Sequence, residues 1–224
     1  TVMAVRTPEV FFQQIKLLTP DPKTGKRDET KIKAFFAAHP EMAEFNQWKE
    51  DYVASSSFAT EKYHSINAFY LVNNNGERQA VRWAMAPQAE PQPLDENISD
   101  SHPDALQIEL AQRLENDVVR FDMLVTLAND SDDENNPTVA WPEERTVINA
   151  GTVVIRAVEP QQGSACNGIN FDPLVLPKGM EATADPILNA RSAVYAESYR
   201  RRARESFQQQ ADSQKTGQQK AGAQ

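Results

Sequence analysis

Arg191, Tyr195 and Arg202 are the residues whose types and spacing point most directly to chemistry. They are separated by four and seven residues, in a stretch without Gly or Pro between Pro186 and Gly217. At about 100° per residue of an α-helix, they lie within roughly 40° of one another on one helical face. A guanidinium favours the ionised form of a neighbouring phenol, and a second one about two turns away can pair with an acid group. The triplet therefore suits a flat, anionic, metal-bearing ligand.

The helix that carries this triplet has a clear start signal. Asp185 is a favoured N-cap residue, and Pro186 is suited to the first helical position. The pattern Arg-x-x-x-Tyr by itself occurs by chance on many helices, so its interpretation depends on the residues that surround it.

Residues 171–204 resemble the proximal haem helix of the haem catalases, and most of all that of the small catalase-related peroxidases. The family signature is Arg-x-x-x-Tyr after a Pro-Gly-Ile/Met-Glu and Asp-Pro turn region. The residues that match it are Pro177, Gly179, Met180, Glu181, Asp185, Pro186, Arg191 and Tyr195. Residues 5–11, 58–83 and 136–142 match further family stretches in the same order, so the resemblance covers nearly the whole chain as far as Arg204.

In that family a tyrosine is the axial ligand of the haem iron, which is a known family property and does not follow from the spacing. The resemblance implies haem b as the cofactor. The residues it implies for the site are Tyr195 as metal ligand, Arg191 as its support, Arg202 on a haem propionate, and Phe11 packed on the porphyrin. Phe11 as an ordinary core residue of an amphipathic helix is an equal alternative. The family's distal His and Asn are expected upstream of Thr1, so no catalytic residue is assigned in this chain.

The resemblance implies a haem-dependent peroxidase that reduces hydrogen peroxide or organic peroxides with a small organic electron donor. The alternative is a haem-binding or inactive remnant without redox turnover, since the distal His and Asn are absent from this sequence. An α+β binding domain unrelated to haem is a third reading. A homo-oligomer stays open as a partner, and the resemblance favours the periplasm over the cytoplasm as the compartment.

Composition limits the other function classes. The chain has 224 residues and a net charge of −9, which suits one domain and argues against nucleic acid or an anionic membrane as a partner. No apolar run approaches the roughly eighteen residues of a membrane span. The one cysteine, Cys166, lies in a loop-like stretch and allows no intramolecular disulfide.

The three histidines have different expected roles. His39 and His102 each precede a Pro near an expected helix start, which is typical of surface or capping residues. His64 opens an expected strand and is a weak candidate for a position near haem.

The expected fold is α+β, with an antiparallel sheet that forms part of a catalase-type β-barrel. Surrounding helices and a C-terminal proximal haem helix complete it. Helices are expected over residues 7–18, 28–38, 40–50 and 103–114, and strands over 63–74, 77–86, 117–128 and 146–158. Asn75-Gly76 is a strong hairpin signal between the first two strands. Residues 1–206 are expected to form the haem-binding core, N-terminally incomplete, and 207–224 a disordered tail.

Overall fold

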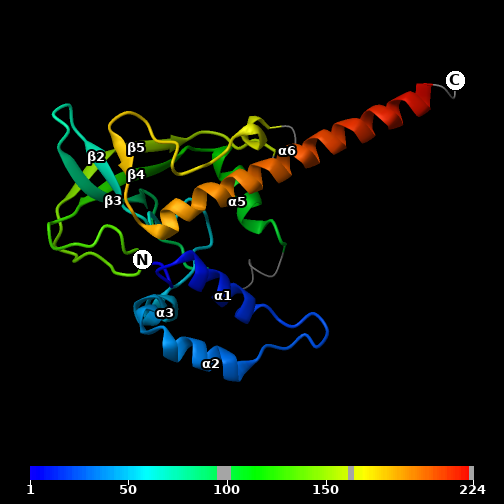
Figure 1. Ribbon diagram of the computed structural model, residues 1–224. Helices are drawn as coiled ribbons and strands as arrows, with labels where there is room; N and C mark the ends of the chain where they lie inside the picture. The colour runs from blue at the N-terminus through cyan, green and yellow to red at the C-terminus, as the bar shows by residue number, and fades with distance from the viewer. Residues whose placement is uncertain (95–101, 161–163, 222–224) are drawn as a thin grey trace. The chain divides into compact units, whose positions relative to one another are not determined.

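The computed structural model describes residues 1–94, 102–160 and 164–221, with side chains described as far as residue 209. The helices are α1 (Pro8–Leu18), α2 (Glu29–Ala38), η1 (Pro40–Met42), α3 (Ala43–Asp51), α5 (Ala105–Leu114), η2 (Ala165–Gly168) and α6 (Pro186–Ala221). The strands are β1 (Tyr63–His64), β2 (Phe69–Val72), β3 (Arg78–Pro87), β4 (Val119–Leu127), β5 (Val147–Ile155) and β6 (Met180–Ala182) (Figure 1).

The chain forms two compact units. The first consists of Thr1–Val158 and Leu176–Asn189, and the second of Glu159–Val175 and Ala190–Gln224. Helix α6 begins in the first unit and continues in the second as a single unbroken helix (Figure 1). The division of the chain into a core and a tail at Phe207 stays a prediction, while the helix is described as far as Ala221.

The first unit is built on a six-stranded antiparallel sheet with the strand order β5-β4-β3-β2-β6, and β1 pairs with β3. Its central hairpin joins β2 to β3, with Phe69 opposite Val81. The turn forms as expected at Asn75-Gly76, where Gly76 has a φ of 82°, a conformation that glycine adopts without steric cost. The expected α+β class with an antiparallel sheet is confirmed.

The expected strand over residues 63–74 is wrong in its middle, where the chain forms the separate strands β1 and β2. Ser65 interrupts the pairing because its side-chain oxygen accepts a hydrogen bond from the Trp83 backbone N–H, at 2.9 Å. Asn67, between β1 and β2, is buried, and its side-chain amide donates a hydrogen bond to the Asp185 carboxylate. Strand β6 was not expected, since three residues give too short a pattern to recognise.

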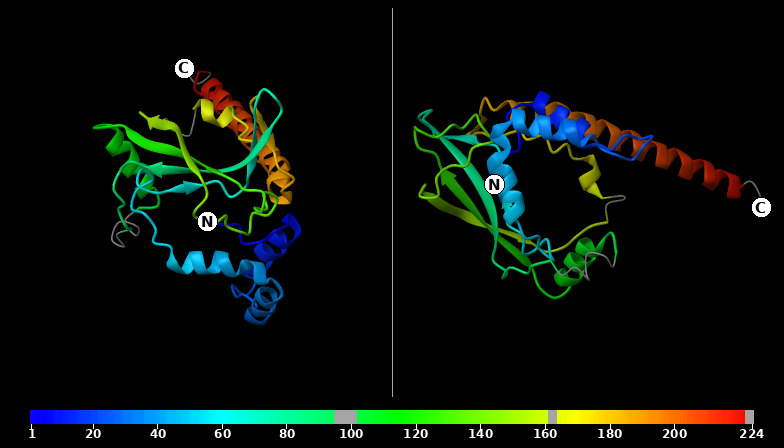
Figure 2. Two further views of the ribbon diagram at one scale, coloured as in Figure 1. Left: turned by 90° about the vertical axis from the view of Figure 1, so that its left-hand side faces the viewer. Right: turned by 90° about the horizontal axis from the view of Figure 1, so that it is seen from below.

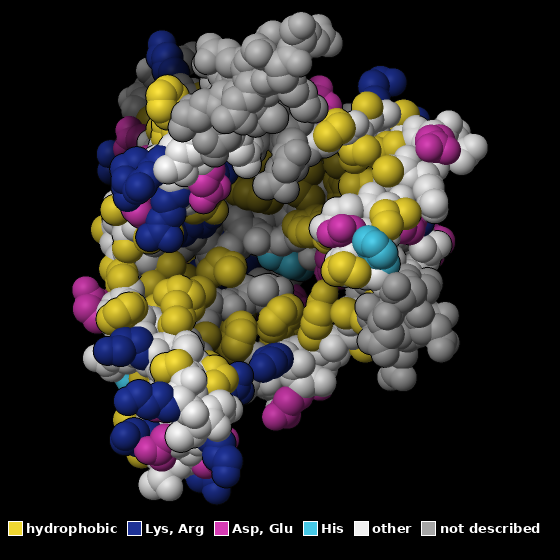
Figure 3. All heavy atoms as spheres, turned by 90° about the vertical axis from the view of Figure 1, so that its right-hand side faces the viewer, with side chains coloured by type: hydrophobic (Ala, Val, Ile, Leu, Met, Phe, Trp, Pro, Cys, Tyr) yellow, Lys and Arg dark blue, Asp and Glu magenta, His cyan; other side chains and the backbone are white. Residues whose placement is uncertain are grey.

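The sheet is open, as expected for a partial barrel. Among the described residues β5 pairs only with β4, so its other edge is unpaired. The first eight residues of β5 are exposed, and they include Val147, Ile148, Val153 and Val154. Figure 3 shows that hydrophobic side chains also gather in the open on one face of the molecule. An uncovered apolar edge strand is unusual for a soluble sheet.

The helices of the first unit confirm the expected elements. Helices α1, α2 and α3 gather apart from the strands (Figure 2) around a small core of Ala4, Val5 and Met42. Thr7 and Asp28 cap the first two helices with their side-chain oxygens. A second core forms where α5 packs with Ala59, Val119 and Phe121. No helix within the described ranges is long and apolar enough to cross a membrane.

Candidate functional site on helix α6

A fully buried carboxylate fixes the start of α6. Asp185 Oδ1 accepts hydrogen bonds from the backbone N–H groups of Ile187 and Leu188, at 2.8 and 3.4 Å. Its other oxygen, Oδ2, accepts one from the Asn67 side-chain amide at 2.7 Å. The expected N-cap at Asp185, with Pro186 as the first helical residue, is therefore confirmed.

Arg191 and Tyr195 are brought into contact on α6, as their spacing predicts. Arg191 Nη2 donates a hydrogen bond to the Tyr195 phenol oxygen at 3.1 Å. The Arg191 guanidinium carbon lies 5.4 Å from the centroid of the tyrosine ring, and both side chains are half-buried. The positively charged guanidinium of Arg191 is thus held beside the phenol oxygen of Tyr195.

Arg202 lies two turns further along the same helix and is held by three neighbours. Its Nη1 donates to Ser198 Oγ and its Nη2 to the Ile169 carbonyl, each at 2.8 Å. The Tyr199 ring lies 6.0 Å from its guanidinium carbon. Since the rise is about 1.5 Å per residue, Arg202 stands roughly 10 Å along the helix axis from Tyr195.

The segment Glu159–Val175 belongs to the same unit as this part of α6. Besides the bond from Arg202 to the Ile169 carbonyl, a second hydrogen bond connects the segment to the helix. Ser192 Oγ donates to Asp172 Oδ2 at 2.5 Å, and the Leu174 backbone N–H donates to Asp172 Oδ1 at 2.9 Å. These two bonds, with Ser192 the larger cause, lower the pKa of Asp172 below its usual value. The Asp172 carboxylate therefore holds the part of the segment that contains Ile169 next to α6.

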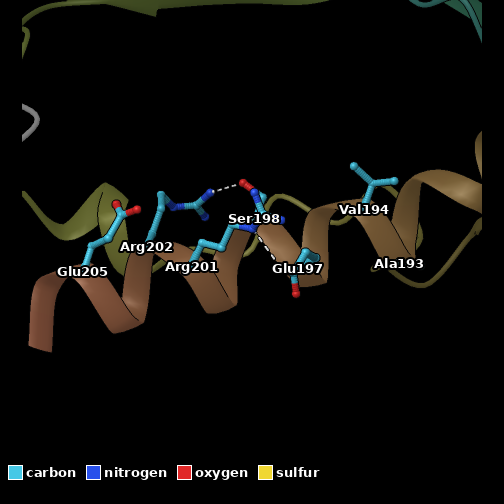
Figure 4. A pocket seen from close by; sticks show the side chains of 7 residues that line it. All are labelled: Ala193, Val194, Glu197, Ser198, Arg201, Arg202 and Glu205. Atoms are coloured by element: carbon cyan, nitrogen blue, oxygen red, sulfur yellow. Dashed lines mark hydrogen bonds and ion pairs between the residues drawn. The ribbon is translucent and has the colours of Figure 1, made fainter. Parts of the chain in front are cut away.

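Figure 4 shows a shallow, open hollow along α6, lined by Ala193, Val194, Glu197, Ser198, Arg201, Arg202 and Glu205. Glu197 pairs with Arg200 at 2.7 Å and with Arg201 at 2.8 Å, and these bonds, Arg200 first, lower its pKa to about 2. Within the described part of the chain, Arg202 contacts no carboxylate. Unlike Arg200 and Arg201, Arg202 can therefore still receive an acid group.

Phe11 lies on α1 in the first unit and is 39% exposed. Phe12 and Ile15 beside it are more exposed, while the buried residue of this helix is Gln14. Phe11 thus presents part of its ring on an open apolar surface. Its role on a porphyrin stays a prediction.

The histidines make local contacts. His39 Nδ1 lies 2.9 Å from Glu41 Oε1, and His102 Nδ1 accepts the Asp104 backbone N–H at 3.1 Å. His64 lies on β1, where partial burial lowers its pKa to about 4. His64 is therefore neutral near pH 7.

Sequence reasoning gave no role to Arg82, although it stands in one of the matched family stretches. Arg82 is only 9% exposed and donates to the carbonyls of Val139 at 2.8 Å and Asn136 at 3.1 Å. Its guanidinium carbon lies 4.6 Å from the centroid of the Trp141 ring. Burial lowers the pKa of Arg82, and the nearby charge of Asp185 opposes that shift. An arginine between two apolar residues, Val81 and Trp83, in the middle of β3 was the available signal.

The sequence profile of one protein family, described as "Catalase", matches residues 1–218. The chain therefore belongs to the catalase family.

Two curated relatives are each described as "Catalase-related peroxidase". The one from Synechococcus elongatus is 39% identical over 208 residues, which cover 91% of this chain and 60% of the relative. The one from Mycolicibacterium paratuberculosis is 31% identical over 202 residues, covering 88% of this chain and 62% of the relative. The chain thus spans about three fifths of the length of these relatives.

Solved catalases share the fold. A fungal catalase aligns with a TM-score of 0.77 at 18% identity, covering 90% of this chain and 43% of that structure. Catalase A from Saccharomyces cerevisiae aligns with a TM-score of 0.75 at 20% identity, covering 90% and 44%. The expected membership of the catalase superfamily and the expected partial barrel are both confirmed.

Proposed function

We propose that the protein acts as a haem-dependent peroxidase that reduces hydrogen peroxide or organic peroxides with a small organic electron donor. The hydrogen bond from Arg191 to the Tyr195 phenol oxygen, at 3.1 Å on a capped helix, is the observation that carries this proposal. The relatives described as catalase-related peroxidases support the reaction class.

The residues of α6 fit haem b in their chemistry. Tyr195 offers a phenol oxygen as a ligand for iron, and Arg191 donates a hydrogen bond to that oxygen. Arg202 offers a guanidinium, the natural partner of a propionate carboxylate. Phe11 lies on α1 in the first unit, and its contact with a porphyrin stays a prediction from the sequence. When bound, the haem iron supplies the site at which a peroxide is bound and reduced.

Each of these side chains has a definable task. Arg191 holds the phenol oxygen of Tyr195 in place through its hydrogen bond. Arg202 would hold a propionate carboxylate of the cofactor with its guanidinium.

The reaction class can be tested by loading the purified chain with hemin and supplying hydrogen peroxide together with a chromogenic phenolic donor. Peroxide-dependent oxidation of the donor above the rate of free hemin supports the proposal. A saturable haem spectrum without any turnover above free hemin would favour haem binding without redox turnover. The same assay on a longer chain that includes the upstream residues separates loss of the distal groups from a wrong assignment.

A further inference from the structure

We propose that Ser198 is a positioning residue for the cofactor, which holds the guanidinium of Arg202 so that it can bind a carboxylate. The inference rests on the proposed function, because the carboxylate in question is a haem propionate. It concerns a residue one helical turn before Arg202, and no motif of the sequence pointed to it.

The guanidinium of Arg202 is fixed from separate directions. Ser198 Oγ accepts from Nη1 and the Ile169 carbonyl accepts from Nη2, each at 2.8 Å. Tyr199 lies against the guanidinium, with its ring centroid 6.0 Å from the guanidinium carbon. Figure 4 shows the bond between Ser198 and Arg202 at the hollow that both residues line.

These contacts leave Arg202 able to bind a ligand. A guanidinium has five N–H donors in a planar fork, and Ser198 and Ile169 use one donor each. The remaining donors can form the paired hydrogen bonds that arginine makes with carboxylates. A long side chain that is already held in one orientation loses less conformational freedom on binding, so the ligand binds more tightly.

The neighbouring arginines do not offer the same group. Arg200 and Arg201 both pair with Glu197, at 2.7 and 2.8 Å. Arg202 is held by a neutral hydroxyl and a neutral carbonyl, which orient its charge and do not cancel it. The difference between a carboxylate partner and a serine partner therefore distinguishes Arg202 from Arg200 and Arg201.

The inference can be tested by measuring the dissociation constants of hemin and of hemin dimethyl ester, whose propionates are blocked. We expect Ser198→Ala to weaken hemin binding about five-fold, the effect of one hydrogen bond. The same change is expected to leave the affinity for the dimethyl ester unchanged. Ser198→Thr keeps the hydroxyl and is expected to restore hemin binding. Ser206→Ala is the matched control for a serine replaced by alanine on the same helix.

Several outcomes would overturn the inference. Equal weakening of both ligands by Ser198→Ala would show a structural effect on the helix. Unchanged hemin affinity in Ser198→Ala would show that the hydrogen bond does not matter for binding. Arg202→Leu should remove the difference between the two ligands, and a persisting difference would place the carboxylate elsewhere. A wild-type chain that binds neither ligand would instead contradict the proposed function itself.

Discussion

The side-chain amide of Asn67 donates a 2.7 Å hydrogen bond to Asp185 Oδ2, although the two residues are 118 positions apart in the chain. Both are buried, and Asp185 is fully inaccessible to solvent. The other carboxylate oxygen caps the first turn of α6. One buried side chain therefore joins the loop between β1 and β2 to the helix that carries the candidate site.

Replacing Asp185 by Ala should lower the free energy of unfolding by about 2 kcal/mol or more. The helix loses its cap, and the buried Asn67 amide loses its acceptor. Urea unfolding followed by circular dichroism measures the change. Asp28→Ala is the matched control, since Asp28 caps α2 in an exposed position. A loss in Asp185→Ala no larger than in that control would contradict the role of the Asn67 bond.

The ion pair of Asp132 and Arg145 should make stability depend on acid pH. The side chains are 4% and 11% exposed, and Arg145 Nε lies 2.7 Å from Asp132 Oδ2. Hydrogen bonding by Arg145 lowers the pKa of Asp132 below its usual value. The pair therefore contributes its full stability above the unfolded pKa of about 3.9, and the contribution is lost as the pH falls through the lower folded pKa.

Unfolding of the wild type and Asp132→Asn in urea, compared at pH 7 and near pH 2, tests this dependence. Asp132→Asn should have a lower free energy of unfolding than the wild type at pH 7. The difference between the two free energies should be smaller near pH 2. Asp117→Asn serves as the control, because the pair of Asp117 with Arg120 is exposed and 3.8 Å long. A gap that stays constant with pH would show that the Asp132 carboxylate is not what stabilises the connection between β4 and β5.

Replacing Arg82 by Lys should destabilise the protein by about 1–3 kcal/mol, even though the charge is kept. A lysine cannot reproduce the planar fork that reaches the carbonyls of both Val139 and Asn136. Thermal and urea unfolding measure the effect. Arg120→Lys, at a more exposed position, should change stability by no more than about 0.5 kcal/mol. Equal effects in the two variants would refute the special role of the buried guanidinium.

The local structure around the candidate site could be predicted from the sequence because its signals are short-range. The start at Asp185 and Pro186 depends on residues one to three positions apart, and the contact of Arg191 with Tyr195 depends on one helical turn. The hairpin at Asn75-Gly76 is equally local. Patterns of this kind depend only on residues close together in the sequence, so they can be recognised without knowledge of the fold.

Contacts between distant segments could not be predicted in the same way. The bond of Asn67 to Asp185 and that of Arg202 to the Ile169 carbonyl join residues 118 and 33 positions apart. Every residue type has a backbone carbonyl, so the sequence does not indicate that the carbonyl of Ile169 is the acceptor. Strand β6 was missed because it exists only through its pairing with β2.

The most direct test of the account is a hemin titration of the wild type and Tyr195→Phe, followed by visible absorption. The wild type should give a saturable ferric high-spin spectrum with the charge-transfer bands of a phenolate ligand. Tyr195→Phe keeps the aromatic ring and removes only the phenol oxygen. It should therefore lose those bands. An identical spectrum in the variant would show that Tyr195 is not the iron ligand and would contradict the assignment of α6 as the haem-binding helix.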